Sequence, residues 1–265
     1  MVFLAYYYTG VNMKKPIIAV AQIRYWDLNK RHNVDKIKRY IRKAKSKGAD
    51  IVCFPESCVY KTENMRFDDQ FIKDIKQECK KNQIWCIISE NFILDKKTYN
   101  LALLIDRSGK IRGKYKKIHL QEGPGYYSVR PGKKVHVFQT DFATIGILIC
   151  WDLAFPESFR SMKKAGAEIV FCPAQWLYEK RAYKKKHKEQ ETKLLKSLVR
   201  ARAFENLFFV VLCNPVFDDE ELISYSAISS PHRILKDIVD EEGLIIAEIN
   251  LNDIKRYQKI YKKKL

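Results

Sequence analysis

The sequence contains no apolar run that approaches the ~20 consecutive residues needed to cross a membrane as a helix. It also lacks the order of charges found in a secretion signal, because Lys14 and Lys15 follow the first apolar stretch instead of preceding it. Neither a membrane span nor secretion is predicted. We expect a cytoplasmic protein.

The cysteines lack the arrangement of a disulfide framework or a zinc site. Their number, seven, is odd, no two are spaced as Cys-x-x-Cys, and no histidines stand near them at zinc spacing. Most lie in apolar, strand-like runs, where cysteine is usually a small core residue. A reducing compartment and no structural metal are therefore predicted. The seven are Cys53, Cys58, Cys79, Cys86, Cys150, Cys172 and Cys213.

Acidic residues are scarce relative to basic ones. The chain has 31 Asp and Glu against 50 Lys and Arg, a net charge of +19 and a pI near 9.5. This balance suggests a nucleic-acid partner. However, lysine is spread along the whole chain, and no zinc-finger, helix-turn-helix or RNA-recognition pattern occurs. We favour a lysine-rich solvated surface, with only weak, salt-sensitive binding of polyanions.

Apolar periodicity predicts an α/β protein in which strands alternate with helices. At 265 residues and 46% hydrophobic, the chain can bury a large core as one domain without a linker. Helices should cover both outer faces of packed sheets. The predicted strands are Pro16–Gln22, Asp50–Phe54, Ile84–Ser89, Asn100–Asp106, Ile111–Leu120, Val135–Phe138, Ala143–Cys150, Glu168–Pro173, Leu207–Cys213, Ser226–Ser230 and Leu244–Asn250, and the predicted helices are Asn33–Lys47, Arg66–Lys81, Phe155–Ala165 and Lys186–Phe204.

Cys150 stands where an apolar strand ends in Cys-Trp-Asp. A sharp turn there would place the sulfur and the next backbone N–H groups around one reacting carbon, as in acyl-transfer sites. The alternative is a buried structural cysteine, the commoner role of an unpaired cysteine. A free thiol is only a few per cent thiolate near neutrality, so the nucleophile hypothesis also requires a base and an oxyanion stabiliser.

Two other strand ends carry residues that could serve as the base and the oxyanion stabiliser. Glu56 follows Pro55 at the end of a short apolar run, and the segment Lys110–Leu120 alternates lysines with apolar residues. A solvated loop glutamate and a solvated strand face remain open as alternatives.

These three segments, FPES, KYKKIHL and ICWDLAFPES, resemble the signature of the nitrilase superfamily of carbon–nitrogen hydrolases. The resemblance implies a four-layer α-β-β-α sandwich formed by one domain over residues 1–265, with residues 1–12 outside its core and Met13 as the expected start. It makes Glu56 the general base, Lys117 the cationic partner and Cys150 the nucleophile. It implies no cofactor, and a homodimer or larger homo-oligomer to which the segment after Leu251 would contribute.

Lys117 and the backbone N–H of Trp151 would then stabilise the negative charge that develops on the substrate oxygen. Lys116 competes with Lys117 for this role. Neighbouring side chains of a strand point to opposite faces, so only one of the two can point inward. The family pattern, a lysine immediately before Ile-His-Leu, selects Lys117.

Substrate-binding residues are less well marked. The resemblance places Trp176 in the pocket wall and the backbone of Trp151 and Asp152 at its edge, and Tyr60 is a further wall candidate; any of them could instead belong to the core, and Asp152 could brace the turn. Many relatives carry another glutamate between the lysine and the cysteine. Glu122 either takes that role or is solvated.

The predicted activity is hydrolysis of a small linear amide or N-carbamoyl compound. A true nitrilase uses the same three residues and is the second hypothesis. A non-catalytic binding protein on the same fold and a nucleic-acid-binding protein are alternatives from other classes. If the basic run from Glu179 to Lys188 overhangs the pocket, it would attract an acidic substrate.

Overall fold

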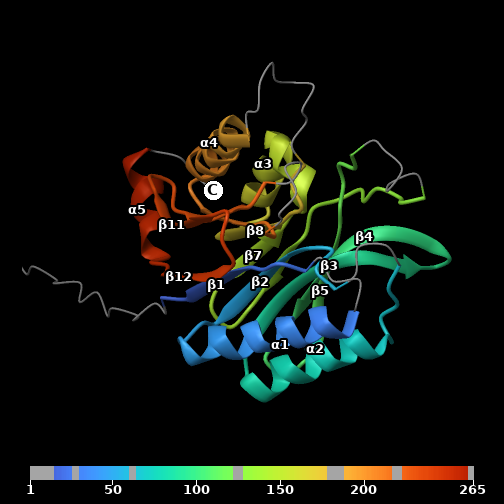
Figure 1. Ribbon diagram of the computed structural model, residues 1–265. Coiled ribbons are helices and arrows are strands. Elements are labelled where there is room, and N and C mark those ends of the chain that lie inside the picture. Colours follow the sequence, from blue (N-terminus) through green and yellow to red (C-terminus); the bar gives the residue numbers. More distant parts are fainter. Residues whose placement is uncertain are drawn as a thin grey trace, which may run out of the picture.

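The structure is a computed structural model that describes residues 15–25, 30–59, 64–121, 128–177, 188–216 and 223–261. The predicted appendage, residues 1–12, lies outside them. Twelve strands form two six-stranded mixed sheets within the described residues. The α-β-β-α order of layers predicted from the sequence is confirmed (Figure 1).

The first sheet has the strand order β12-β1-β2-β3-β4-β5, and the second has the order β11-β10-β9-β8-β7-β6. In each sheet three strands run parallel, β1 to β3 in the first and β7 to β9 in the second. The first sheet contains β1 (Ile17–Gln22), β2 (Ile51–Glu56), β3 (Trp85–Leu94), β4 (Lys97–Ile105), β5 (Ile111–Lys116) and β12 (Gly243–Glu248). The second contains β6 (Val137–Gln139), β7 (Thr144–Ile147), β8 (Ile169–Pro173), β9 (Phe209–Cys213), β10 (Tyr225–Ser229) and β11 (Ile234–Val239).

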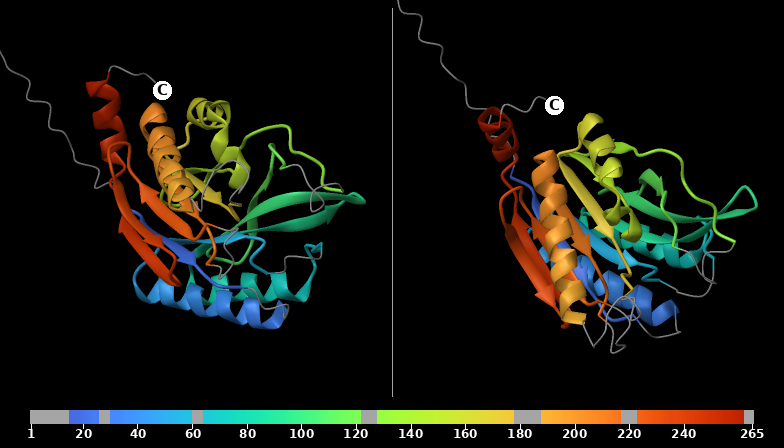
Figure 2. Two further views of the ribbon diagram at one scale, coloured as in Figure 1. Left: turned by 45° about the horizontal axis from the view of Figure 1, so that its top comes forward. Right: turned by 90° about the horizontal axis from the view of Figure 1, so that it is seen from above.

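Helices α1 (Lys30–Ser46) and α2 (Gln70–Asn82) cover the outer face of the first sheet, and α3 (Pro156–Lys164) and α4 (Lys188–Asn206) cover that of the second. Figure 2 shows α3 and α4 together on the second sheet, with α5 (Asn252–Ile260) beyond α4. The described helices include none that is both long and apolar enough to span a membrane.

Alternation along the strands separates two apolar layers. Ile18 and Val20 of β1 face the second sheet and join the larger core cluster, whereas Ala19 and Ala21 face α1 and α2. Both faces of the parallel strands are therefore buried, and β2 has no exposed residue.

Several element boundaries differ from the sequence prediction. The strand predicted to reach Leu120 ends at Lys116, because the backbone of Lys117 bonds to Asn100 on one side and to Gly132 on the other. The strand predicted to end at Cys150 ends at Ile147, and a 3₁₀ turn, η2 (Cys150–Ala154), follows. Strand β11 and helix α5 were not predicted. Their mixed polar and apolar residues lie at the margin of the core, where the burial pattern is weak.

Candidate active site

Glu56 is the last residue of β2 and is almost completely buried, with 1% of its surface exposed. Its backbone N–H donates to the carbonyl of Ala174, which follows β8 of the other sheet, over 3.2 Å. The hydroxyl of Tyr25 donates to the Glu56 carbonyl over 2.6 Å. The ends of the two parallel strands thus meet across the sandwich, and Glu56 lies at their junction.

Three donors hold the Glu56 carboxylate. One oxygen accepts from the Lys117 ammonium at 3.0 Å and from the Asn100 amide at 2.6 Å. The other accepts from the backbone N–H of Gln175 at 3.1 Å. Lys117 has none of its side chain exposed. The carboxylate and the ammonium therefore form an ion pair that is shielded from water, with further hydrogen bonds that fix its orientation.

Cys150 lies in a left-handed backbone conformation, with φ of 47°, and is fully buried. A non-glycine residue in this region is strained, and such strain commonly marks functional turns. The sharp turn predicted after the strand is present. Asp152 stabilises it, because its carboxylate accepts from the Ile149 backbone N–H at 3.0 Å.

The pKa of the Cys150 thiol is raised well above its ordinary value. Burial is the largest cause, and the negative charge of Glu56 and a hydrogen bond with Glu56 add to it. The ammonium of Lys117 and the backbone N–H of Gln175 act in the opposite direction. Cys150 therefore rests as a neutral thiol, and a neighbouring base must take its proton before the sulfur can attack.

The two adjacent lysines point to opposite faces, as alternation predicts. Lys117 reaches Glu56, whereas the Lys116 ammonium lies 3.8 Å from the centre of the Tyr99 ring on the other face. The structure thus brings together Glu56, Lys117 and Cys150, which lie far apart in the sequence.

Asp152 is fully buried, and its carboxylate oxygens bind within the protein. One accepts from the Tyr115 hydroxyl at 2.7 Å, and the other contacts the backbone N–H and the imidazole Nδ1 of His119 at 2.9 and 2.8 Å. With Ile149 N–H, these contacts use four acceptor sites. The expected bracing role is present, and this carboxylate is not available to a substrate.

The remaining predicted residues fall into two groups. Trp151 and Trp176 lie together, with ring centres 5.3 Å apart, and the Trp176 indole donates to Glu191 of α4 at 2.7 Å. Tyr60 and Glu122 lie outside the described residues, as does the basic run up to residue 187. No group of His, Cys, Asp and Glu within the described ranges could hold a metal ion.

Sequence reasoning assigned no role to Asn100 and Gln175, both of which contact Glu56. Asn100 is the first buried residue of β4, and a polar residue at this position was only a weak indication of a functional role. Gln175 contributes through its backbone N–H, which every residue except proline carries. Its side-chain nitrogen is buried and has no hydrogen-bond partner among the described residues. A substrate oxygen is a suitable acceptor for it.

Comparison with known proteins agrees with this geometry. Residues 17–259 match the carbon-nitrogen hydrolase family model. The chain is 30% identical to 2-oxoglutaramate amidase of Bacillus subtilis over 234 residues, which cover 83% of the chain and 85% of that protein. It is 37% identical to N-carbamoylputrescine amidase of Arabidopsis thaliana over 160 residues, 53% of the chain and about half (52%) of that relative.

Solved structures share the fold. A carbon-nitrogen hydrolase from Helicobacter pylori superposes with a TM-score of 0.84 at 20% identity, covering 94% of both chains. A mutant amidase from Nesterenkonia, with acrylamide added at its active-site cysteine, superposes with a TM-score of 0.78 at 21% identity, covering 94% of this chain and all of that one.

Proposed function

Because the chain belongs to the carbon–nitrogen hydrolase family, we propose that Glu56, Lys117 and Cys150 form its catalytic triad. The enzyme hydrolyses a non-peptide carbon–nitrogen bond of a small molecule. The observation that carries the assignment is the Glu56 carboxylate, which contacts the Lys117 ammonium at 3.0 Å and lies near enough to the buried Cys150 thiol for its charge to raise the pKa of that thiol.

In the first half of the reaction, Glu56 takes the thiol proton as the sulfur attacks the carbonyl carbon. The negative charge that forms on the carbonyl oxygen is stabilised by the Lys117 ammonium and the Trp151 backbone N–H. The carbon–nitrogen bond then breaks, and Glu56 returns the proton to the leaving nitrogen, which departs as ammonia. A thioester with Cys150 remains.

In the second half, Glu56 takes a proton from water as the water oxygen attacks the thioester carbon. The carbon–sulfur bond breaks, and the proton returns to the sulfur, which regenerates the thiol. The raised pKa of Cys150 favours this return, because burial and the Glu56 charge disfavour a free thiolate.

The substrate class is a small linear amide or N-carbamoyl compound. The two relatives reported above are named for amides and carbamoyl amines, and they favour this class over nitriles. Trp151 and Trp176 would form an apolar wall beside the reacting carbon, and the unpaired amide nitrogen of Gln175 would bind a polar end of the substrate. Tyr60 and Glu122 stay candidates for substrate contact.

Ammonia release from a panel of linear amides, N-carbamoyl amines, ureas and nitriles tests this function. We expect turnover of at least one amide or carbamoyl compound, and its loss in Cys150→Ala. Cys79→Ala removes another buried thiol, on α2, and should keep the activity. Full activity in Cys150→Ala would exclude the thioester mechanism, and turnover of nitriles alone would exclude the amidase assignment.

We also propose a homodimer that works in a reducing compartment such as the cytoplasm. Exposed Phe204 of α4 lies against exposed Tyr261 at the end of α5, with ring centres 5.5 Å apart, and Ile260 beside it is 63% exposed. Exposed apolar side chains gathered at the ends of two helices favour association. All seven cysteines are free thiols, including the proposed nucleophile, which must stay reduced to react.

A further inference from the structure

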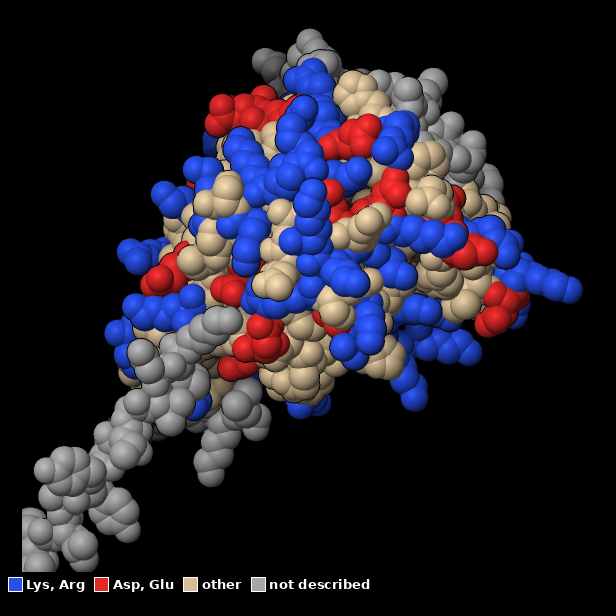
Figure 3. All heavy atoms as spheres, turned by 90° about the horizontal axis from the view of Figure 1, so that it is seen from below, with Lys and Arg blue, Asp and Glu red and all other residues tan. Residues whose placement is uncertain are grey.

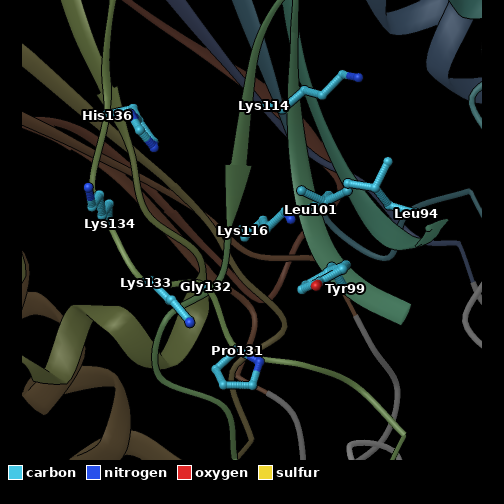
Figure 4. Close-up of a pocket in the computed structure, with 10 residues that line it drawn as sticks. All are labelled: Leu94, Tyr99, Leu101, Lys114, Lys116, Pro131, Gly132, Lys133, Lys134 and His136. Atoms are coloured by element: carbon cyan, nitrogen blue, oxygen red, sulfur yellow. The ribbon is translucent and has the colours of Figure 1, made fainter. Parts of the chain in front are cut away.

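A pocket of about 400 Å³ lies beside the edge strand β5, and none of the three proposed catalytic residues lines it. One wall consists of side chains from β4 and β5, among them Tyr99, Lys114 and Lys116 (Figure 4). The segment from Pro131 to His136 forms the opposite wall and contributes Lys133 and Lys134.

The pocket faces away from the reaction centre. Tyr115, between the two β5 lysines, points inward and donates to Asp152 at 2.7 Å. Because strand side chains alternate, Lys114 and Lys116 lie on the other face. A ligand in this pocket would therefore not contact Cys150, and the proposed catalytic function does not account for the lysines here.

The charge of the pocket is one-sided. Four lysines and His136 line it, and the described lining residues include no Asp or Glu. None of the four lysines forms an ion pair with a described residue. Arg112, two residues before Lys114 on the same strand, pairs with Asp106. The charge of Arg112 is thus neutralised by a carboxylate. The four lysine ammonium groups of the pocket have no carboxylate partner among the described residues.

Aromatic rings and backbone packing hold the two walls in place. The Lys116 ammonium lies 3.8 Å from the centre of the Tyr99 ring, and the Lys114 ammonium lies 4.0 Å from that of Phe67. Such cation–π contacts restrict flexible side chains while leaving N–H donors available. At Gly132, an added Cβ would lie 2.2 Å from the Lys116 carbonyl oxygen, so the second wall packs directly on β5.

We propose that this pocket binds a small molecule that carries at least two phosphate groups. Each phosphate monoester carries a charge of about −1.5 to −2 near neutrality, so two of them match four lysines, whereas two carboxylates would supply only half of this charge. The volume is within the range of small-molecule sites, and Leu94 and Pro131 provide apolar contact for the rest of the ligand.

Calorimetric titration of the full-length protein with inorganic pyrophosphate, at about 0.15 M salt, tests the proposal. We expect saturable binding of one pyrophosphate per chain, with malonate at least tenfold weaker because it carries less charge. The double variant Lys116→Gln/Lys133→Gln removes one ammonium from each wall and should weaken pyrophosphate at least tenfold. The matched control Lys45→Gln/Lys73→Gln removes two exposed lysines from α1 and α2 and should change affinity less than twofold.

Melting curves without ligand establish that each variant is folded. Lys133→Glu, at an exposed position, provides a second test of the pocket that leaves Lys116 intact. The proposal is overturned if both double variants weaken binding equally, because bulk charge would then explain it. Malonate binding as tightly as pyrophosphate would exclude the phosphate class. If the protein binds a single-stranded oligonucleotide through the pocket lysines but does not bind pyrophosphate, the ligand is a nucleic acid and the small-molecule proposal is wrong.

Discussion

At the scale of single residues, the ion pair between Glu56 and Lys117 is the central feature of the proposed site. Removing two charges from water costs several kcal/mol per ion, and their mutual attraction offsets this only when further hydrogen bonds are made. Asn100 and Gln175 supply those bonds to Glu56. The pair is therefore stable as a unit, and the loss of one partner should be felt in both folding and catalysis.

Lys117→Gln is expected to lower kcat about 10²- to 10³-fold, because the oxyanion loses a fixed donor. It should also lower the free energy of unfolding by about 3 kcal/mol, because the Glu56 charge is left buried and unpaired. Steady-state kinetics and urea unfolding measure the two effects. Lys110→Gln, at an exposed position just before the same strand, should change neither.

The double variant Glu56→Gln/Lys117→Gln separates the two effects. With both charges removed, most of the lost stability should return, whereas activity should stay as low as in Cys150→Ala. Stability that stays low in the double variant would show that packing around Lys117, and not the unpaired charge, causes the loss.

The sequence was most informative about residues whose side chains have distinctive chemistry. Glu56, Lys117 and Cys150 each follow or end a strand-like run, and the structure places the three together. Gln175 could not be found in this way, because it contacts Glu56 through a backbone N–H, which does not depend on the residue type. The bracing contacts of Asp152 depend on His119 and Tyr115, whose proximity arises only in the fold.

At the scale of elements, the ends of β2, β5 and β7 position the site, and their exact lengths matter. Periodicity extended the second and third of these strands through the proposed catalytic residues Lys117 and Cys150. In the structure the backbone leaves the strand just before Lys117 and three residues before Cys150, through contacts with distant segments. Local pattern could predict that these strands exist, but not the tertiary contacts at which each one ends.

Gly132→Ala tests whether the segment beside β5 positions Lys117, the proposed catalytic lysine. Gly132 donates to the Lys117 carbonyl at 2.7 Å, and a Cβ at residue 132 would collide with the Lys116 carbonyl. The segment must shift, so we expect at least a tenfold loss of kcat/KM together with a lower melting temperature.

Gly166→Ala is the matched control. Its positive φ of 89° makes alanine strained there, at a cost of about 1 kcal/mol, but no atom lies within 4 Å of the new Cβ. The control should lose stability and keep its kcat/KM. Equal losses of activity in both variants would show that reduced stability, and not the position of Lys117, accounts for the effect.

Asp106 begins the β4–β5 connection and makes stability depend on pH. Burial alone would raise its pKa, but the Ser108 hydroxyl, the Lys110 backbone N–H and the Arg112 guanidinium donate to the carboxylate, and the pKa is lowered from 3.8 to about 2. A lowered pKa stabilises the fold above the ordinary value, and this contribution is lost as pH falls from about 4 to about 2.

We therefore expect Asp106→Asn to lower the free energy of unfolding by about 2 kcal/mol near neutrality. The difference from the unmodified protein should shrink as the pH falls through the same range, which chemical denaturation at a series of pH values measures. Asp68→Asn, at a carboxylate that is 73% exposed, should show no such difference. A gap between Asp106→Asn and the parent that persists at low pH would exclude titration of Asp106 as its cause.

At the scale of the whole molecule, the excess of positive charge is spread over the surface. Lys and Arg cover much of the face formed by α1 and α2, with acidic residues scattered among them (Figure 3). A net charge of +19 predicts weak polyanion binding that salt abolishes. Composition reported this total, but it could not indicate that four of the lysines converge on one pocket, because that depends on the fold.

Association is the other property that belongs to the whole molecule. Helix α5 was not predicted as an element, although the segment after Leu251 was expected to contribute to an interface. In the structure it brings Tyr261 against Phe204 of α4, Ile260 directly precedes Tyr261, and all three are exposed in the single chain. Leaving this patch in water is unfavourable by about 25 cal/mol per Å² of apolar surface, which a second copy would remove.

Ile260→Asp is therefore expected to convert a dimer of twice 31.3 kDa into a monomer, because a charge would be buried at the centre of the patch. Light scattering coupled to gel filtration measures the mass. Ile93→Asp makes the same change at an exposed isoleucine on β3 and should leave the dimer intact. A monomeric parent protein would contradict the proposed dimer. A dimer that survives Ile260→Asp but not Ile93→Asp would place the interface away from α4 and α5.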